Sequence, residues 1–189
     1  KYFNDDWNLL QKFLENRGNP PYSISGDLDL YKVPVKTLGN LRNVGGDLRL
    51  YKTPIKSLGN LEYVGGYLNL RETPIESLGN LKQVGNYLSL YATSIESLGN
   101  LKHVGGDLDL YKVPVKTLGN LRNVGIDLYL DGTPIESLGN LEYVGGDLNL
   151  TETPIESLGN LKHVGGDLFL ESTPLSKTTT KSEIRSKVN

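Results

Sequence analysis

The side chains that could do chemistry in this chain of 189 residues are mostly carboxylates and phenols. Aspartate pairs such as Asp27 and Asp29 could lie at the separation that glycoside hydrolysis requires, but that chemistry needs one carboxyl group with a raised pKa. An open, solvated strand does not supply the burial that raises a carboxyl pKa. The two histidines, His103 and His163, lie three repeat units apart, too far for a catalytic dyad. The sequence therefore predicts no enzyme, no catalytic residue, no metal site and no cofactor.

Composition narrows the choice of partners. The chain carries 20 Lys and Arg against 22 Asp and Glu, and it has no cysteine. A net charge near −2 gives no general attraction to nucleic acid or to an anionic membrane, and no apolar run is long enough to span a bilayer. The absence of cysteine favours the cytoplasm without fixing the compartment. Because the chain begins at Lys1 and contains no methionine, we expect that its natural start lies upstream.

A repeat of twenty residues decides the expected fold. Its first part reads x-L-x-L, and its second part reads T-P-I-x-S-L-G-N-L-x-x-V-G. We call the repeat units coils one to eight and count them from Gly26. The x-L-x-L segments lie at 26–30, 46–50, 66–70, 86–90, 106–110, 126–130, 146–150 and 166–170.

The letters of one coil predict its local structure. L-x-L is a short alternating strand with both leucines on one face, and T-P ends the strand in a turn because proline lacks an N–H. G-N and G-G mark two further corners, where we expect positive φ angles. The return path is too short for a helix, so we expect extended or 3₁₀ backbone there. In coil two the predicted core consists of Leu48, Leu50, Ile55, Leu58, Leu61 and Val64.

One coil cannot bury enough apolar surface to fold alone, so the coils must stack. The stretch from Gly26 to Gly45 returns letter for letter from Gly106 to Gly125, and the segments that follow return nearly unchanged. A block of four coils has been doubled as a unit. Because each coil in a stack meets only its neighbours, such copying preserves every local contact. An array lengthened in this way favours a long surface over a single catalytic pocket.

The pattern L-x-L-x-x-T-x-I resembles the leucine-rich repeat, with Leu48, Leu50, Thr53 and Ile55 in the corresponding places. The period resembles that of the short bacterial repeats, and L-G-N-L-x-x-V-G-G-x-L is similar to receptor L-domain repeats and to arrays in bacterial and phage proteins. The resemblance implies a right-handed solenoid, mainly β, with one parallel sheet of about eight short strands. Threonine or valine stands where the family usually has asparagine, so an asparagine ladder is expected instead at Asn40 and its equivalents.

The two ends differ from the repeat and divide the chain into three parts. Residues 1–25 are predicted to form a capping helix and a linker, with Asn4 or Asp5 as N-cap and Trp7 packed under the first coil. The repeat solenoid is predicted for 26–175. Residues 176–189 are predicted to be a C-terminal cap or tail, with a short helix at 182–188.

Three columns of variable residues flank the leucines and are predicted to point away from the core. Ten of their positions are acidic and two are basic, a local charge of −8, and seven of the eleven tyrosines share this face. Tyrosine and arginine are enriched at interface cores. We predict that the partner-binding residues are Asp47, Arg49, Tyr51, Tyr67, Arg71, Tyr87, Tyr91, Asp107, Asp109, Tyr111, Asp127, Tyr129, Asp131, Asp147, Asp167 and Phe169.

The acidic column has three interpretations from sequence alone. The aspartates could accept backbone amides after Gly-Gly, bind a basic partner, or hold calcium, which needs six to eight oxygen ligands. The tyrosines could bind a partner or simply shield one another. The preferred function is a non-catalytic module that binds a protein with a basic surface. The resemblance implies, more narrowly, a phage- or bacterium-encoded inhibitor of a cellular protein. The alternatives are a structural or adhesive segment of a larger surface protein and a carbohydrate-binding domain. The oligomeric state stays open.

Overall fold

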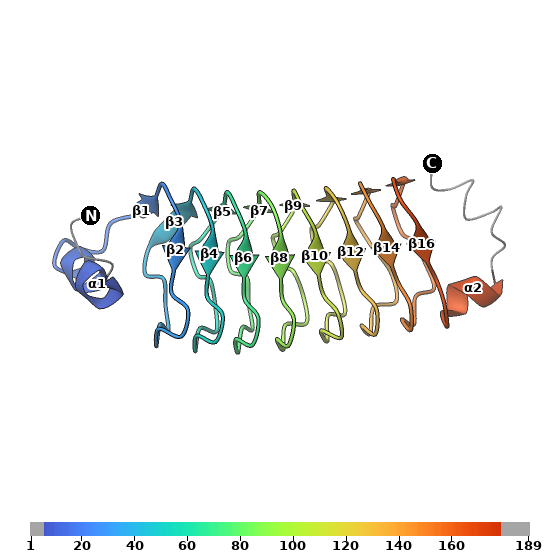
Figure 1. Ribbon diagram of the computed structural model, residues 1–189, viewed down its shortest axis with the longest axis horizontal. Coiled ribbons are helices and arrows are strands. Elements are labelled where there is room, and N and C mark those ends of the chain that lie inside the picture. Colours follow the sequence, from blue (N-terminus) through green and yellow to red (C-terminus); the bar gives the residue numbers. More distant parts are fainter. Residues whose placement is uncertain (1–5, 179–189) are drawn as a thin grey trace.

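The computed structural model describes residues 6–178, which form an N-terminal helix and a parallel β-solenoid of about seven turns (Figure 1). Coils one to seven each contribute one short strand to each of two eight-stranded sheets; a strand before coil one completes one sheet and a strand of coil eight completes the other. The mainly β solenoid with a helical cap, predicted from the repeat, is confirmed. Neighbouring coils pair in a constant register with a shift of twenty residues, as in Leu48 opposite Leu68 and Leu108 opposite Leu128.

The first sheet, here the Leu sheet, is the one predicted from L-x-L. Its strands begin at a leucine whose side chain enters the core, while the next residue points outward. Each inner strand pairs in parallel with the strands of the coils before and after it, and the edge strands of the first and last coils pair with one neighbour each. The strands are β2 (Leu28–Asp29), β4 (Leu48–Arg49), β6 (Leu68–Asn69), β8 (Leu88–Ser89), β10 (Leu108–Asp109), β12 (Leu128–Tyr129), β14 (Leu148–Asn149) and β16 (Leu168–Phe169).

A second sheet, here the Val sheet, lies on the return path, where the sequence predicts only extended or 3₁₀ backbone. Its strands end in the valine of V-G or its equivalent, and the following glycine N–H donates to the preceding coil, as from Gly65 to the Val44 carbonyl at 2.8 Å. The strands are β1 (Tyr22–Ile24), β3 (Leu41–Val44), β5 (Tyr63–Val64), β7 (Gln83–Val84), β9 (His103–Val104), β11 (Asn123–Val124), β13 (Tyr143–Val144) and β15 (His163–Val164).

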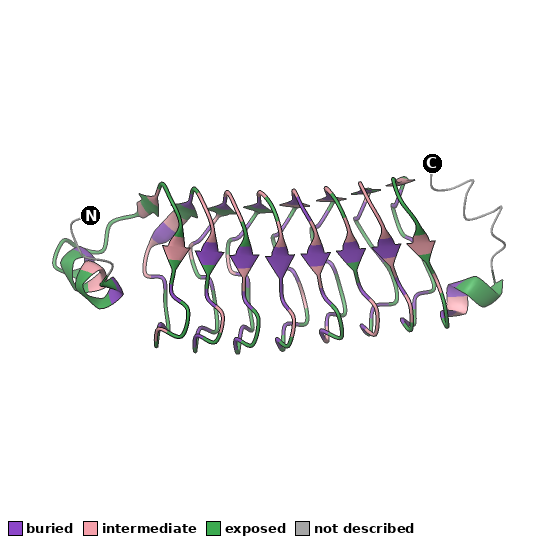
Figure 2. Ribbon diagram, viewed as in Figure 1, coloured by how far each residue is buried: buried purple, intermediate pink, exposed green. Residues whose placement is uncertain are grey.

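The core is a continuous aliphatic column between the two sheets. All six residues predicted for coil two are at most 1% exposed. In Figure 2 the leucines of the central strands of the Leu sheet are buried, whereas those of β2 and β16, in the end coils, are only half-buried. The hydroxyl groups of most corner threonines also enter the core, where Thr53 donates to the Leu50 carbonyl at 2.7 Å. Valine occupies the equivalent position at 33, where it is half-buried, and at 113, where it is 1% exposed.

The glycines of the two corners have different physical roles. Gly39, Gly59 and their G-N equivalents have φ between +55° and +59°, as predicted. The prediction of positive φ is wrong for the G-G corner, because none of its described glycines has one. There, a Cβ built on Gly65 would lie 2.1 Å from the Gly45 carbonyl oxygen, so the coils stack too closely for any side chain. Positive φ occurs instead in the turn before T-P, at Lys52 and its equivalents.

The helix α1 (Trp7–Glu15) covers the first coil. Asp6 is its N-cap and accepts from the Leu9 N–H at 3.0 Å, whereas the predicted caps Asn4 and Asp5 lie outside the described residues. Trp7 is 6% exposed and belongs to the same buried cluster as the coil leucines, which confirms its core role. The last described segment is the short helix α2 (Pro174–Thr178). The helix predicted at 182–188 lies outside the described residues.

Candidate functional site

The three variable columns lie on the outer face of the Leu sheet, as predicted. None of the sixteen predicted partner-binding residues is buried. Arg49, Tyr67, Arg71, Tyr111, Tyr129, Asp167 and Phe169 are exposed; Asp47, Tyr51, Tyr87, Tyr91, Asp107, Asp109, Asp127, Asp131 and Asp147 are half-buried. The face is brought together by stacking, because its columns consist of residues that are twenty positions apart in the chain.

The first column of aspartates has a structural role. The Oδ1 of Asp127 accepts the backbone N–H of Asp147 in the next coil at 2.8 Å, and the same bond recurs from Asp27, Asp47, Asp107 and Asp147. The interpretation that these carboxylates accept turn amides is therefore confirmed for one oxygen of each of these side chains. The second oxygen takes part in other contacts in two of them, since Asp47 Oδ2 accepts from Arg49 and Asp127 Oδ2 accepts from the Tyr129 hydroxyl.

The middle column also fixes the backbone. Asp109 Oδ1 accepts from the Tyr111 N–H at 3.1 Å, and Asp29, Asn69 and Asn149 make the equivalent bond two residues ahead. Ser89 is fully buried and donates to Asp109 Oδ2 at 3.3 Å. Aspartate and asparagine are interchangeable for this turn bond, so the choice of aspartate at 29 and 109 adds charge without adding a backbone contact.

The third column is a strip of stacked rings and cations. The rings of Tyr31 and Tyr51 stack at 5.3 Å between centroids, and those of Tyr91 and Tyr111 stack at 6.3 Å. The Arg71 guanidinium lies 4.9 Å from the Tyr91 ring centroid, over the second pair. Within each pair, the rings cover part of each other's faces, so the strip offers mainly ring edges and hydroxyl groups to solvent.

A shallow hollow of about 520 Å³ opens on the Leu sheet between coils four and seven. Its walls are three tyrosines, three aspartates and one asparagine: Tyr87, Tyr111, Tyr129, Asp107, Asp109, Asp131 and Asn149. The tyrosines and aspartates were predicted as partner-binding residues from their columns, whereas Asn149 was not. The sequence did not predict that these side chains surround one concave space. The hollow depends on the relative lengths of side chains from neighbouring coils.

Electrostatics in the hollow favour the uncharged forms of several groups. The hydrogen bond from the Tyr129 hydroxyl to Asp127 Oδ2, 2.9 Å long, together with burial and nearby carboxylates, raises the pKa of Tyr129 to about 12. Burial, followed by repulsion from Asp109, raises the pKa of Asp131. Burial also raises the pKa of Tyr87. Nearby carboxylates contribute to all three shifts, while Lys112 opposes that of Asp131.

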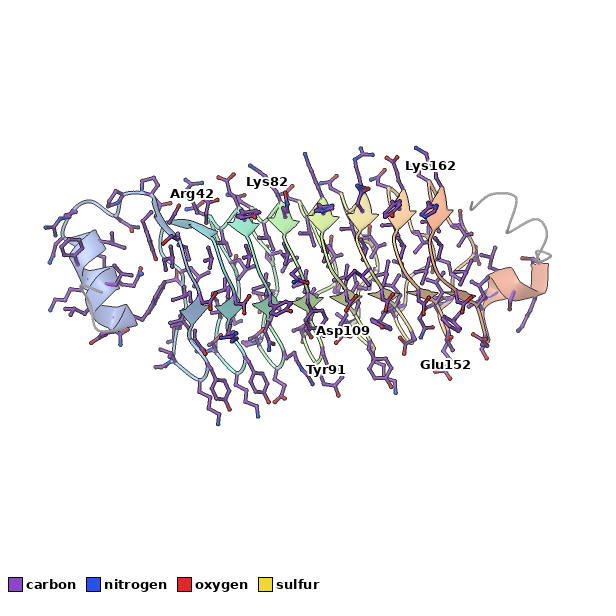
Figure 3. All side chains as sticks on the ribbon, turned by 45° about the horizontal axis from the view of Figure 1, so that its top comes forward. Arg42, Lys82, Tyr91, Asp109, Glu152 and Lys162 are labelled. Carbon is purple, nitrogen blue, oxygen red and sulfur yellow. The ribbon has the colours of Figure 1, made fainter. Side chains whose placement is uncertain are left out.

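Along the Val sheet, glutamates are paired with cations of the neighbouring coils, unlike most aspartates of the Leu sheet. Glu62 pairs with Arg42 at 3.1 Å and with Lys82, while Glu142 pairs with Arg122 at 2.6 Å and Lys162 at 2.7 Å. These pairs lower the pKa of both glutamates, chiefly through the hydrogen bonds from Lys82 and Lys162. In Figure 3, Arg42, Lys82 and Lys162 lie along one side of the solenoid, away from Asp109 and Tyr91. Their twenty-residue spacing with alternating sign was the signal in the sequence that could have revealed them.

The asparagine column at the G-N corner forms only part of the predicted ladder. Asn60 Nδ2 donates to Asn40 Oδ1 at 3.1 Å, whereas Asn100 and Asn140 donate to glycine carbonyls of the preceding coil at 3.3 and 3.1 Å. His163 lies against Tyr143, with ring centroids 4.8 Å apart, and far along the stack from His103. Among residues 6–178, no group of three or more acidic or histidine side chains is arranged to hold a metal ion.

The part of the chain that the structure describes contains no helix long and apolar enough to cross a membrane. Comparison of the chain with protein-family models, with curated proteins and with solved structures finds no match.

Proposed function

We propose that this chain is a non-catalytic protein-binding module of the leucine-rich-repeat type, which binds a partner with a basic surface through the outer face of the Leu sheet. The observation that carries the proposal is an imbalance in ion pairing. Arg49 is the only cation that pairs with aspartates of this face among the described residues. From Asp107 to Asp167, no described aspartate on the face has an ion pair, whereas Glu62 and Glu142 on the Val sheet have two each.

Charge repulsion and side-chain composition support a protein partner for this face. Unpaired surface carboxylates in stacked columns repel one another, and a cationic surface relieves that repulsion while speeding association. Tyrosines beside the carboxylates add apolar area with a polar tip, the composition typical of interface cores. An inhibitor that covers a basic surface of a cellular protein would use the face in this way.

The stacked rings argue against the carbohydrate alternative. Sugar binding by tyrosine uses the flat face of the ring, but Tyr31 and Tyr51 cover each other, and Tyr91 lies between Arg71 and Tyr111. Enzymatic use of the carboxylates is disfavoured because the hollow is open and shallow. A general acid needs an enclosed site that excludes water.

The test compares two variants of equal charge. The face variant carries Asp107→Asn, Asp109→Asn and Asp131→Asn, which remove three charges and keep an oxygen acceptor at each position. The control carries Glu76→Gln, Glu136→Gln and Glu156→Gln, three exposed residues at the corner after T-P-I. Each protein is immobilised, exposed to host lysate, and then titrated with the purified captured protein at low and high salt.

The proposal predicts one main partner that the wild type and the control retain and the face variant loses. Affinity should fall steeply with salt because the contact is between opposite charges. A partner held equally by the face variant and the control, or the absence of any partner, as for a structural or adhesive segment, would overturn the proposal.

A further inference from the structure

The chain contains two copies of one surface, and their differences point to a ligand. Residues 26–85 and 106–165 differ at only eight positions. Six of these differences change charge, and all six make the later copy more negative, by seven units in total. Four of the eight differing positions lie in the variable columns of the Leu sheet. With the residue of the earlier copy first, they are Arg49 and Tyr129, Tyr51 and Asp131, Tyr67 and Asp147, and Arg71 and Thr151.

In the earlier copy, a guanidinium occupies the acidic site. Arg49 Nη2 donates to Asp47 Oδ2 at 2.8 Å, and Arg49 Nη1 lies 3.8 Å from Asp29 Oδ2. The guanidinium thus sits between carboxylates from two neighbouring coils. Delocalised, planar and weakly hydrated, it suits a bridge between two carboxylates better than an ammonium does.

In the later copy, the two aspartates are kept but the guanidinium is absent. Tyr129 stands in the place of Arg49, and its hydroxyl donates to Asp127 Oδ2. Among the residues that the structure describes, Asp109 Oδ2 accepts only from the hydroxyl groups of Tyr87 and Ser89, at 3.1 and 3.3 Å. These donors are neutral, so they satisfy hydrogen bonds without balancing the charge of either carboxylate.

Two further differences make the later copy more negative at the same point. Asp131 replaces Tyr51 and brings a third carboxylate, whose pKa is raised by burial, and Gly132 replaces the cation Lys52. Lys112 lies nearby, with its Nζ 4.9 Å from the Tyr111 ring centroid, but it forms no ion pair with the described aspartates. Asp131 lines the hollow of about 520 Å³, and Tyr111 and Tyr129 in its walls are each 37% exposed.

We propose that this hollow receives an arginine side chain of the protein partner, with its guanidinium between the carboxylates of Asp109 and Asp131 and against the rings of Tyr111 and Tyr129. In the earlier copy Arg49 pairs with Asp29 and Asp47, the counterparts of Asp109 and Asp127, so carboxylates of neighbouring coils on this face do hold a guanidinium. This inference rests on the proposed function, because it assumes that the partner is a protein, and it identifies the side chain that the partner must present.

The direct test uses short peptides as probes. Protein labelled with 3-fluorotyrosine is titrated with acetyl-Gly-Arg-Gly-amide, and the ¹⁹F signals of Tyr51, Tyr111 and Tyr129 are assigned by replacing each tyrosine with phenylalanine. The arginine peptide should shift the signals of Tyr111 and Tyr129 and leave that of Tyr51 unchanged, because Arg49 already fills the earlier copy. The peptides with citrulline or lysine in place of arginine should bind at least several-fold more weakly.

A substitution taken from the chain itself provides the second arm. Tyr129→Arg places a guanidinium where Arg49 stands in the earlier copy, so it should fold normally and weaken binding of the arginine peptide by about tenfold or more. Tyr63→Arg is the matched control, because Tyr63 is also 37% exposed but lies on the Val sheet, and it should leave the affinity unchanged. Equal binding of the citrulline or lysine peptide, an equal shift of Tyr51, or full affinity in Tyr129→Arg would overturn the proposal.

The outcomes separate this inference from the proposed function. If the partner is lost by the Asp→Asn face variant but retained by Tyr129→Arg, the face binds the partner and the hollow does not receive its arginine. If the arginine peptide binds in the hollow but the face variant still holds the captured partner, the hollow recognises guanidinium and the proposed role of the face in that complex is wrong.

Discussion

Gly65 stacks directly on Gly45: a Cβ added to Gly65 would lie 2.1 Å from the Gly45 carbonyl oxygen and 2.9 Å from its carbonyl carbon. The same relationship recurs in every coil of the V-G column, where the closest approach to backbone oxygen is between 2.0 and 2.3 Å. The obstacle is backbone, so it cannot move without breaking the hydrogen bond that joins the coils. This contact, rather than a turn that needs positive φ, explains why this glycine never varies.

Gly65→Ala should therefore lower the free energy of unfolding by about 3 kcal/mol or more, at the upper end of what overpacking costs. Gly26→Ala is the control, because nothing lies within 4 Å of a Cβ at Gly26 and its φ is not positive. It should change stability by less than about 0.5 kcal/mol. Urea unfolding followed by circular dichroism measures both, and equal effects of the two substitutions would contradict the stacking explanation.

Ala92→Gly should stabilise the protein. Ala92 has φ +57° in the turn before T-S, and the equivalent residue in coil six is Gly132 with φ +69°. A left-handed conformation costs a non-glycine residue about 1–2 kcal/mol, which exceeds the entropy that glycine loses on folding. We expect a gain of about 0.5–1 kcal/mol in the unfolding free energy. Loss of stability in a urea titration would show that the turn does not strain alanine.

The buried threonines give a prediction with an internal control. Thr133 Oγ1 is the one buried side-chain polar atom without a hydrogen-bond partner among the described residues, whereas Thr153 Oγ1 donates to the Leu150 carbonyl at 2.7 Å. Thr133→Val should be neutral or stabilising, because it removes an unsatisfied hydroxyl and Val113 already occupies the equivalent position. Thr153→Val should cost about 1 kcal/mol through its lost hydrogen bond. A larger loss from Thr133→Val would contradict this.

Asp131→Asn should make stability less dependent on pH. Burial raises the pKa of Asp131 in the folded protein, so the folded state binds this proton more tightly than the unfolded state does. Protonation therefore stabilises the fold, and this contribution is lost as the pH rises through the folded-state pKa. Asp131→Asn should raise Tm at pH 7 relative to the wild type and leave it nearly equal at pH 3, where both side chains are neutral. Differential scanning calorimetry at the two pH values measures this difference.

The structural and charge roles of the aspartate column are separable. Asp127→Asn keeps an oxygen to accept the Asp147 N–H, whereas Asp127→Ala removes the acceptor of that 2.8 Å bond. We expect the alanine variant to lose about 1–3 kcal/mol of stability and the asparagine variant to lose much less. If both variants unfold at the same urea concentration, the hydrogen bond between coils contributes little and the column is conserved along the chain for its charge.

The repeat made most of the fold predictable because its signals are local. L-x-L specifies a strand with one buried face, T-P specifies its end, and the constant spacing specifies that the coils stack. Outward columns followed from the same alternation, so all sixteen candidate residues were placed on an accessible face. The ion pairs of Glu62 and Glu142 were not predicted, because they join residues twenty positions apart on the return path, where no strand was expected.

The sequence by itself determined the periodic solenoid, its aliphatic core and the excess of carboxylate and phenol side chains on one side. Only the tertiary structure decided that the return path forms a second sheet, that glycine at V-G is required by the backbone of the preceding coil, and that five of the six first-column aspartates use one oxygen for an amide of the next coil. It also decided that Asp109, Asp131 and Tyr129 share a hollow. These features are contacts between residues twenty or more positions apart, and such contacts depend on how closely and in what register the coils stack.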